Sequence, residues 1–331
     1  METLLKTQSK VMVTGACGFI GASLVKMLAE SGYGVVGAGR TPPSDELTKY
    51  FTHFICCDLN QIELNTKFLD GIDSIINLAG LAHNPRIEGK KAEHAYQETN
   101  ALMPQRLARA ALDAGVSKFI HLSSVKAVGE SSPNSRPFDE STPNHEPPAG
   151  IYGRSKWEAE RLLTSTLNNS KTQLIILRPP LIYGPNAKGT LLQLIRLIAL
   201  KVPLPLKSSR ARRSFISNTN LCTAITSCLD KNNRASGLFF VSDGESISVP
   251  NLIEIIATEL GFKPLLFSLP ESLIKLGFAI LRKPDFYEKL FLDLEVKSDE
   301  FQKYFSWTPR QSFQQGIHEM VISFSESKRP S

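Results

Sequence analysis

The stretch GACGFIG at residues 15–21 decides the fold, because glycines stand at its first, fourth and seventh positions. The apolar run at residues 11–13 predicts a strand before it, and Leu24, Val25 and Leu28 recur at helical spacing after it. Glycines in a turn from strand to helix let the backbone approach a pyrophosphate, and the helix N-terminus offers free N–H groups. An ordinary glycine-rich turn is the alternative, but the position in the first strand–helix unit favours a dinucleotide site.

Strand-like and helix-like segments alternate outward from this turn. Strands are expected at residues 11–14, 33–38, 54–57, 73–78, 118–122, 173–177 and 238–241. Helices are expected at residues 22–30, 92–114, 152–167, 190–200, 220–229, 250–260 and 271–281. The alternation predicts an α/β fold with a doubly wound parallel sheet, covered on both faces. We expect a dinucleotide-binding domain at residues 8–180 and a smaller substrate lobe at 181–325, with the chain crossing between them more than once.

The composition of the 331 residues is that of a globular protein, with 42% hydrophobic and 21% charged residues. The net charge of +6 is mild and suits a small anionic substrate, and the basic stretch at 207–213 lacks the aromatic residues of single-strand binders, so no nucleic acid is expected. The five cysteines form no CxxC pair and the six histidines show no metal-ligand spacing. Neither a disulfide framework nor a metal site is therefore expected.

The apolar segments are too short to cross a membrane. No run of about 18 apolar residues occurs and no secretory signal precedes the first strand, so we expect a cytoplasmic protein without stable membrane insertion. The stretch at 271–281 is apolar on several sides. Core packing or a subunit contact, as in a homodimer, is the usual reason, and peripheral membrane contact is the alternative.

The residues after the second predicted strand select the dinucleotide. An acid there accepts hydrogen bonds from the ribose of NAD, whereas an arginine accommodates the phosphate of NADP. This chain has Gly39 and Arg40 and no acid, so we expect NADP, with NAD as the alternative. A solvent-facing Arg40 is the competing explanation. Asp58, after the third strand, is placed either to accept from the adenine amine or to cap a helix at 60–69.

Three polar residues are predicted to carry the chemistry. Tyr152 and Lys156 stand four residues apart at the start of a helix, so they share one face. A phenol has a pKa of about 10, which a neighbouring ammonium and an oxidised nicotinamide would lower. Tyr152 could then move a proton to or from a sugar hydroxyl. Ser124 follows the fifth strand, at the sheet edge where ligands bind, and can hold the reacting oxygen.

Several motifs together resemble the extended short-chain dehydrogenase/reductase family, in its nucleotide-sugar epimerase and dehydratase branch. They are GACGFIG (15–21), NLAG (77–80), SS (123–124), YGRSK (152–156) and RPPLIYGP (178–185). FSWTP at 305–309 is similar to the closing segment of that family, so the resemblance covers nearly the whole chain. It implies a Rossmann-type sheet with a smaller C-terminal α/β lobe for the substrate.

The resemblance also implies roles for the matching residues. Ser124 aligns with the catalytic Ser/Thr, Tyr152 and Lys156 with the acid–base pair, and Arg213 with an arginine that contacts the substrate diphosphate. The residues expected to contact the substrate are His83, Ser124, Lys126, Tyr152 and Arg213. The residues expected to contact the dinucleotide are Gly15, Gly18, Phe19, Ile20, Gly21, Arg40, Asp58, Leu59, Leu78, Ala79, Gly80, Asn100, Tyr152, Lys156 and Pro179.

Within that branch the chain looks most like UDP-glucose 4-epimerase-like proteins of surface-polysaccharide synthesis. These include reductases that turn a UDP-4-keto-6-deoxy-N-acetylhexosamine into UDP-N-acetylquinovosamine. True 4-epimerases carry an acid where this chain has Gly39 and an asparagine where it has Leu181, so we expect the 4-keto reductase. A UDP-glucose or UDP-N-acetylglucosamine 4-epimerase is the alternative. A non-catalytic sensor of the dinucleotide would keep the glycines but would not need Ser124, Tyr152 and Lys156.

Overall fold

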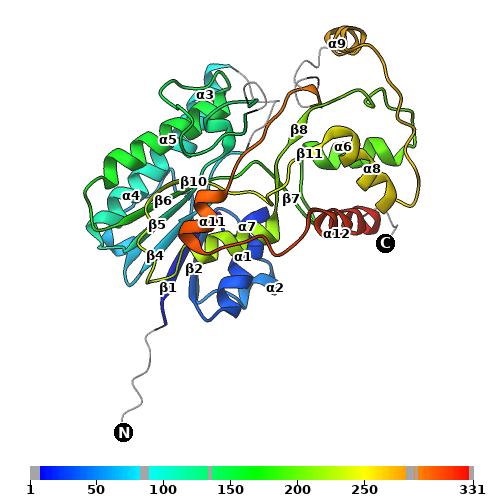
Figure 1. Ribbon diagram of the computed structural model, residues 1–331. Helices are drawn as coiled ribbons and strands as arrows, with labels where there is room; N and C mark the ends of the chain where they lie inside the picture. Colours follow the sequence, from blue (N-terminus) through cyan, green and yellow to red (C-terminus); the bar gives the residue numbers. More distant parts are fainter. Residues whose placement is uncertain (1–7, 83–88, 133–135, 281–286, 288–289, 328–331) are drawn as a thin grey trace.

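The computed structural model describes residues 8–82, 89–132, 136–280, 287 and 290–327. Its centre is a seven-stranded parallel sheet in the order β10-β6-β5-β4-β1-β2-β3, which confirms the doubly wound fold (Figure 1). The strands are β1 Lys10–Thr14, β2 Gly34–Gly39, β3 His53–Cys56, β4 Ser74–Asn77, β5 Lys118–Leu122, β6 Gln173–Arg178 and β10 Gly237–Phe240. The strand order reverses between β1 and β4, so the crevice for a ligand is expected at their carboxyl ends.

Helices cover both faces of this sheet because side chains alternate along each strand. Val11 and Val13 of β1 pack in one core with α1 (Phe19–Glu30) and α7 (Asn218–Ser227). Met12 packs on the other face with α4 (Met103–Asp113) and α5 (Ile151–Leu167). Short helical segments also lie along the chain at α2 Asp45–Thr48, η1 Thr66–Leu69, η3 Val125–Ala127 and α11 Asp299–Phe305.

The helix predicted at residues 92–114 forms, but it contains a π-helical turn that the sequence did not predict. The structure has α3 (Lys90–Gln97), a π-helical turn η2 (Glu98–Leu102) and then α4. Pro104 has no N–H and cannot close an α-helical bond to the carbonyl of Asn100 four residues earlier, which explains the wider turn. The wider turn buries Asn100 completely.

A second core lies in the lobe formed mostly after residue 181 (Figure 1). Its elements are β7 Leu181–Tyr183, α6 Thr190–Ala199, β8 Arg212–Arg213, β9 Phe215–Ser217, β11 Ile247–Ser248, α8 Val249–Glu259, α9 Glu271–Ile280 and α12 Phe313–Glu326. However, β10, α7 and α11 also follow residue 181 and pack with the large sheet. The chain therefore contributes to both cores after residue 181, and the division into 8–180 and 181–325 stays a prediction.

No helix in the described part of the chain is long and apolar enough to cross a membrane.

Candidate active site

The turn between β1 and α1 has the geometry that its glycines predict. Gly15 has φ +68° and its N–H donates to Ala38 O at 2.9 Å, while Gly18 N–H donates to Gly15 O at 3.0 Å. A Cβ on Gly21 would lie 2.2 Å from Gly15 O, and a Cβ on Gly15 would lie 3.0 Å from Ala79 N. Side chains at these two positions would collide with backbone atoms. The glycines therefore allow the tight turn from β1 into the N-terminus of α1.

A pocket of about 350 Å³ opens at this turn, where the strand order reverses. Among its lining residues are eight that the sequence assigned to the dinucleotide: Gly15, Gly18, Arg40, Asp58, Leu59, Leu78, Ala79 and Gly80. Residues that the sequence argument missed also line it: Cys17, Gly39, Thr41, Cys57, Asn60, Leu81, Thr99 and Met103. A glycine cradle at a helix N-terminus fits the pyrophosphate of a dinucleotide, because backbone N–H groups can reach its oxygens.

Arg40 and Asp58 lie in the wall of this pocket, on the loops after β2 and β3. The Arg40 side chain is exposed. Asp58 Oδ1 accepts a hydrogen bond from Asn60 N at 3.0 Å, which closes a turn. The helix predicted at 60–69 is wrong, because only the 3₁₀ turn η1 forms there and Asn65 caps it by accepting from Phe68 N at 3.2 Å. Asp58 is therefore a turn residue beside the pocket and not a helix cap.

The remaining residues assigned to the dinucleotide lie around the pocket or support it. Phe19, Ile20 and Gly21 form the first turn of α1. Asn100 holds the loop after β4, since its Oδ1 accepts from Leu81 N at 2.7 Å and its Nδ2 donates to Leu81 O at 3.1 Å. The Pro179 carbonyl accepts from Val125 N at 2.9 Å, which ties the end of β6 to the segment after Ser124.

Ser124, Tyr152 and Lys156 converge at the carboxyl end of β5. Ser124 caps η3, and its Oγ accepts from Lys126 N at 3.2 Å. Tyr152 lies in the first turn of α5 and shares a hydrogen bond with the Ser124 side chain. Lys156, one turn later, is buried and donates from Nζ to Leu122 O at 2.9 Å. The structure thus brings together the three residues that the sequence singled out for acid–base chemistry.

Burial moves the pKa values of Tyr152 and Lys156 in opposite directions. Burial raises the pKa of Tyr152 to about 12, and the hydrogen bond with Ser124 opposes that rise. Burial lowers the pKa of Lys156 to about 8, and the carboxylate of Glu160 opposes that fall. The Tyr152 phenol therefore stays protonated when no ligand is bound. It can act as a base only when a further positive charge beside it lowers its pKa.

A buried ion pair behind Lys156 was missed by the sequence argument. Glu160 and Arg178 have side chains that are 5% and 4% exposed, and Arg178 NH2 lies 2.6 Å from Glu160 Oε2. Arg178 Nε also donates to Glu160 Oε1 at 2.9 Å, and the Ser123 hydroxyl donates to the same oxygen. The pair joins α5 to the ends of β5 and β6. The only sequence signal is the spacing, since Glu160 follows Lys156 by four residues on the same helical face.

A second buried network crosses three neighbouring strands. Thr14, Asn77 and His121 lie in register on β1, β4 and β5. Thr14 Oγ1 donates to Asn77 Oδ1 at 2.6 Å and accepts from Ala79 N at 3.2 Å, while Asn77 Nδ2 lies 3.0 Å from His121 Nδ1. Burial and the charge of Lys156 hold the pKa of His121 well below its usual value, so the imidazole is neutral. This network fixes the loop after β4 that lines the dinucleotide pocket.

Glu130 links the expected substrate residues to Tyr152, and the sequence argument missed it too. Lys126 Nζ lies 2.7 Å from Glu130 Oε2. The Glu130 carboxylate also acts on the pKa values of both Tyr152 and Arg213, so these side chains lie on one side of the molecule. Arg213 NH1 donates to Leu292 O at 3.0 Å, and burial lowers the pKa of Arg213 to about 10. His83 lies outside the described residues.

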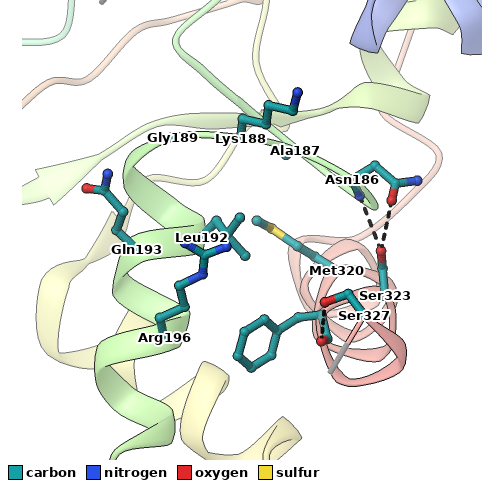
Figure 2. A pocket seen from close by; sticks show the side chains of 11 residues that line it. Asn186, Ala187, Lys188, Gly189, Leu192, Gln193, Arg196, Met320, Ser323 and Ser327 are labelled. Carbon is teal, nitrogen blue, oxygen red and sulfur yellow. Dashed lines mark hydrogen bonds between the residues drawn. The ribbon is translucent and has the colours of Figure 1, made fainter. Parts of the chain in front are cut away.

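A larger pocket of about 470 Å³ lies between α6 and α12 (Figure 2). Lys188, Arg196 and Met320 are among its lining residues, and Asn186 N donates to Ser323 Oγ at 3.3 Å. None of the residues assigned to the reaction or the dinucleotide lines it. The glycine-turn pocket is therefore the better candidate for the reaction, since Gly80 in its wall lies next to Lys156.

Comparison with known proteins agrees with this geometry. Residues 11–241 match the NAD dependent epimerase/dehydratase family. A UDP-glucose 4-epimerase from Vibrio cholerae is 30% identical in an alignment of 329 residues that covers 97% of each chain. A 4-hydroxy-2-methyl-3-oxo-4-farnesyl-3,4-dihydroquinoline-1-oxide ketoreductase from Stigmatella aurantiaca is 21% identical over 93% of this chain and 94% of its own. The crystal structure of a UDP-glucuronic acid 4-epimerase from Bacillus cereus, in complex with NAD, superimposes with a TM-score of 0.77 at 21% identity, over 97% of this chain and 100% of that one.

Proposed function

The chain belongs to the NAD dependent epimerase/dehydratase family, and on that premise we propose that it catalyses oxidation and reduction at C4 of a UDP-sugar. The observation that carries the proposal is the convergence of Ser124, Tyr152 and Lys156 at the end of β5. Lys156 reaches the glycine-turn pocket, because a Cβ on the pocket residue Gly80 would lie 3.5 Å from Lys156 Nζ. A dinucleotide bound in that pocket supplies the hydride acceptor or donor.

The three residues divide the proton chemistry between them. Tyr152 gives a proton to the C4 oxygen when a ketone is reduced and takes it when an alcohol is oxidised. Ser124 holds the same oxygen through its hydroxyl, which already bonds Tyr152. The Lys156 ammonium, fixed by Leu122 O, stabilises the phenolate by its charge. Since the pKa of Tyr152 alone is about 12, the reduction direction starts from the form that the protein already favours.

Arg213 is proposed to bind the diphosphate of the substrate. Its planar guanidinium suits two phosphate oxygens at once, and its location on the same side as Glu130 and Tyr152 supports this role. Arg213→Ala should raise KM for the UDP-sugar by about tenfold to a hundredfold, because a charged hydrogen bond contributes about 1.5–3 kcal/mol. An unchanged KM would remove Arg213 from the substrate site.

Two versions of the reaction are supported by different observations. At the end of β2 the pocket wall has Gly39 and the exposed Arg40 in place of an acid, which favours NADP. NADP would exchange with the solution after each turnover, as in a 4-keto-sugar reductase. The match to a UDP-glucose 4-epimerase over 97% of both chains favours an epimerase with a retained cofactor. We give the reductase as the first candidate and the epimerase as the second.

One experiment separates the two versions. The protein is purified without added cofactor and its bound nucleotide is identified by mass spectrometry. It is then mixed with a UDP-4-keto-6-deoxy-N-acetylhexosamine and NADPH, and separately with UDP-hexoses alone. Consumption of NADPH by protein that carries no nucleotide supports the reductase, with lower NADPH affinity expected for Arg40→Ala. Retained NAD together with interconversion of UDP-hexoses would identify the protein as the epimerase and contradict the reductase.

A homodimer and a cytoplasmic location stay predictions.

A further inference from the structure

Exposed apolar side chains gather in the second lobe and are not spread over the whole surface. Of the twelve exposed large hydrophobic residues in the described part of the chain, nine lie between residues 197 and 292. Six of these nine form what we call the apolar patch: Val202 (42% exposed), Leu265 (64%), Phe267 (41%), Leu269 (36%), Leu273 (55%) and Leu276 (57%). A cluster of exposed apolar side chains on a protein surface usually marks an interaction site.

The extended part of the apolar patch is fixed by backbone hydrogen bonds. Leu204 N donates to Leu265 O at 2.9 Å and Phe267 N donates to Leu204 O at 3.1 Å, so this segment lies along residues 202–207. Side chains alternate along an extended chain, and Leu266 faces the core of the lobe. Leu265, Phe267 and Leu269 are therefore turned outward together by the backbone.

Helix α9 continues the apolar patch directly. It begins after Pro270, whose carbonyl accepts from Leu273 N at 3.0 Å, and it stands at the outer edge of the lobe (Figure 1, top right). Ile274 is only 6% exposed and holds the helix to the protein. Leu273 and Leu276 are three residues apart, so they lie on one face of the helix and point away from the core.

The charges in the segments that carry the apolar patch are mostly positive. The segments 197–210 and 261–276 contain five basic residues, Lys201, Lys207, Arg210, Lys263 and Lys275, all of them exposed. Their one acid is Glu271, which accepts a hydrogen bond from the Tyr287 hydroxyl. Outward leucines with exposed cations in the same segments match an anionic lipid surface, since the leucines enter the acyl boundary and the cations pair with head groups.

We propose that the apolar patch is a docking site for an anionic membrane surface. Binding there is peripheral, because α9 is a short helix attached through Ile274, and no described helix could cross the bilayer. The chain runs from Lys207 and Arg210 straight to Arg212–Arg213 of β8, so the docked lobe is the one that carries the proposed diphosphate residue. The proposal does not depend on which sugar is turned over.

Flotation with lipid vesicles tests this proposal on the full chain. Vesicles of phosphatidylcholine with phosphatidylglycerol should carry the protein upward, pure phosphatidylcholine vesicles should carry much less, and added salt should weaken the binding. The double variant Leu273→Gln, Leu276→Gln should lower the bound fraction at least tenfold. Ile322→Gln on α12 is the matched control, because Ile322 is also exposed (44%) but lies outside the apolar patch, and it should bind as the unchanged protein does.

A second variant keeps the test decisive if the first fails to fold. Lys263→Gln with Lys275→Gln leaves the leucines in place and should also lower binding to the anionic vesicles. Equal binding by all variants, or no binding to either vesicle, would overturn the proposal. Loss of self-association in the leucine variant, seen by sedimentation velocity without any vesicle binding, would instead identify a contact between copies of the chain. Vesicle binding is measured without substrate, so failure of the proposed reaction does not affect it.

Discussion

Tyr152 and Lys156 obtain their properties from the same burial at the end of β5. Burial keeps the phenol of Tyr152 protonated and makes the ammonium of Lys156 unusually ready to lose its proton. Ser124 hydrogen-bonds the phenol, and Leu122 O accepts a hydrogen bond from the ammonium. The pKa values of these two side chains therefore depend on their buried location as much as on their residue type.

Tyr152→Phe removes the proton donor and leaves the ring in place. Turnover should fall by about 10²–10⁴-fold, the range that general acid–base catalysis contributes. Binding of the dinucleotide, measured by fluorescence quenching or calorimetry, should change little, because the glycine-turn pocket is untouched. Tyr304→Phe is the control, since Tyr304 is 50% exposed on α11. Turnover in Tyr152→Phe equal to that of the control would remove Tyr152 from the reaction.

The lowered pKa of Lys156 predicts a pH dependence of stability. Below pH 8 both the folded and unfolded chains hold the proton, so folding carries the full cost of burying the charge. Between about pH 8 and 10.5 only the unfolded chain holds it, and stability rises with pH. Relative to Lys156→Met, the unfolding free energy of the unchanged protein should rise by about 3 kcal/mol across this window. Urea titrations at several pH values check this, and equal slopes would contradict the buried charge. Lys303→Met, at a side chain 71% exposed, should keep the unchanged slope.

Helix α5 is the element that organises the site, because one of its faces carries Tyr152, Lys156 and Glu160 at four-residue intervals. The last of these is locked to Arg178 of β6, so the helix cannot turn or slide without breaking a buried ion pair. The glycine turn before α1 likewise positions the backbone that is proposed to bind the dinucleotide. Helix α5 and this turn therefore set the spacing between the proposed catalytic and cofactor-binding groups.

Breaking the buried pair should be costly. Glu160→Ala leaves the Arg178 charge buried with no carboxylate, and the unfolding free energy should fall by about 3–5 kcal/mol. Glu158→Ala on the same helix removes only a hydrogen bond from Gln97 at the surface and should cost less than about 1 kcal/mol. Urea denaturation measures both variants. Similar losses for the two would mean that the pair does not secure α5.

The glycine turn allows an equally matched comparison. Gly21→Ala places a Cβ 2.2 Å from Gly15 O, so the turn must shift and dinucleotide binding should weaken at least tenfold. Gly39→Ala adds the same atom to the wall of the pocket, but its nearest neighbour there would be the Phe54 ring at 3.8 Å. Binding by Gly39→Ala should therefore stay close to that of the unchanged protein. Calorimetry decides, and equal affinities for the two variants would show that the turn does not cradle the ligand.

Over the whole molecule, local patterns could be predicted from the sequence and long-range partners could not. The glycine turn, the strands of the first half and the Tyr152–Lys156 face follow from spacing within a few residues. The π-helical turn before Pro104 was not predicted because the hydrophobic periodicity continues through it, although the proline is visible in the sequence. The Glu160–Arg178 pair and the Thr14–Asn77–His121 row join residues that meet only once the strands are in register.

The large sheet also draws on distant parts of the chain. Strand β10 lies beside β6 although β7, α6, β8, β9 and α7 come between them in the sequence. Helix α7 packs against α1 across an even longer stretch of chain. Nothing in the local pattern of residues 238–241 says which sheet that strand will join. The two lobes are therefore tied together by chain crossings, and Arg213 of β8 is carried to the side of Tyr152 as a result.

The most direct test of C4 chemistry follows deuterium at the sugar. NADPH deuterated at its transferable position is mixed with a UDP-4-keto-6-deoxy-N-acetylhexosamine, and UDP-hexose deuterated at C4 is incubated alone; NMR then locates the label. We predict a product with deuterium at C4 in one of the two mixtures. A reductase would deliver this deuterium from NADPH, and an epimerase would retain it at C4 while the configuration inverts. Tyr152→Phe should form neither product. Absence of C4 label from both products, or the same labelling with Tyr152→Phe, would contradict redox chemistry at C4 carried by Ser124, Tyr152 and Lys156.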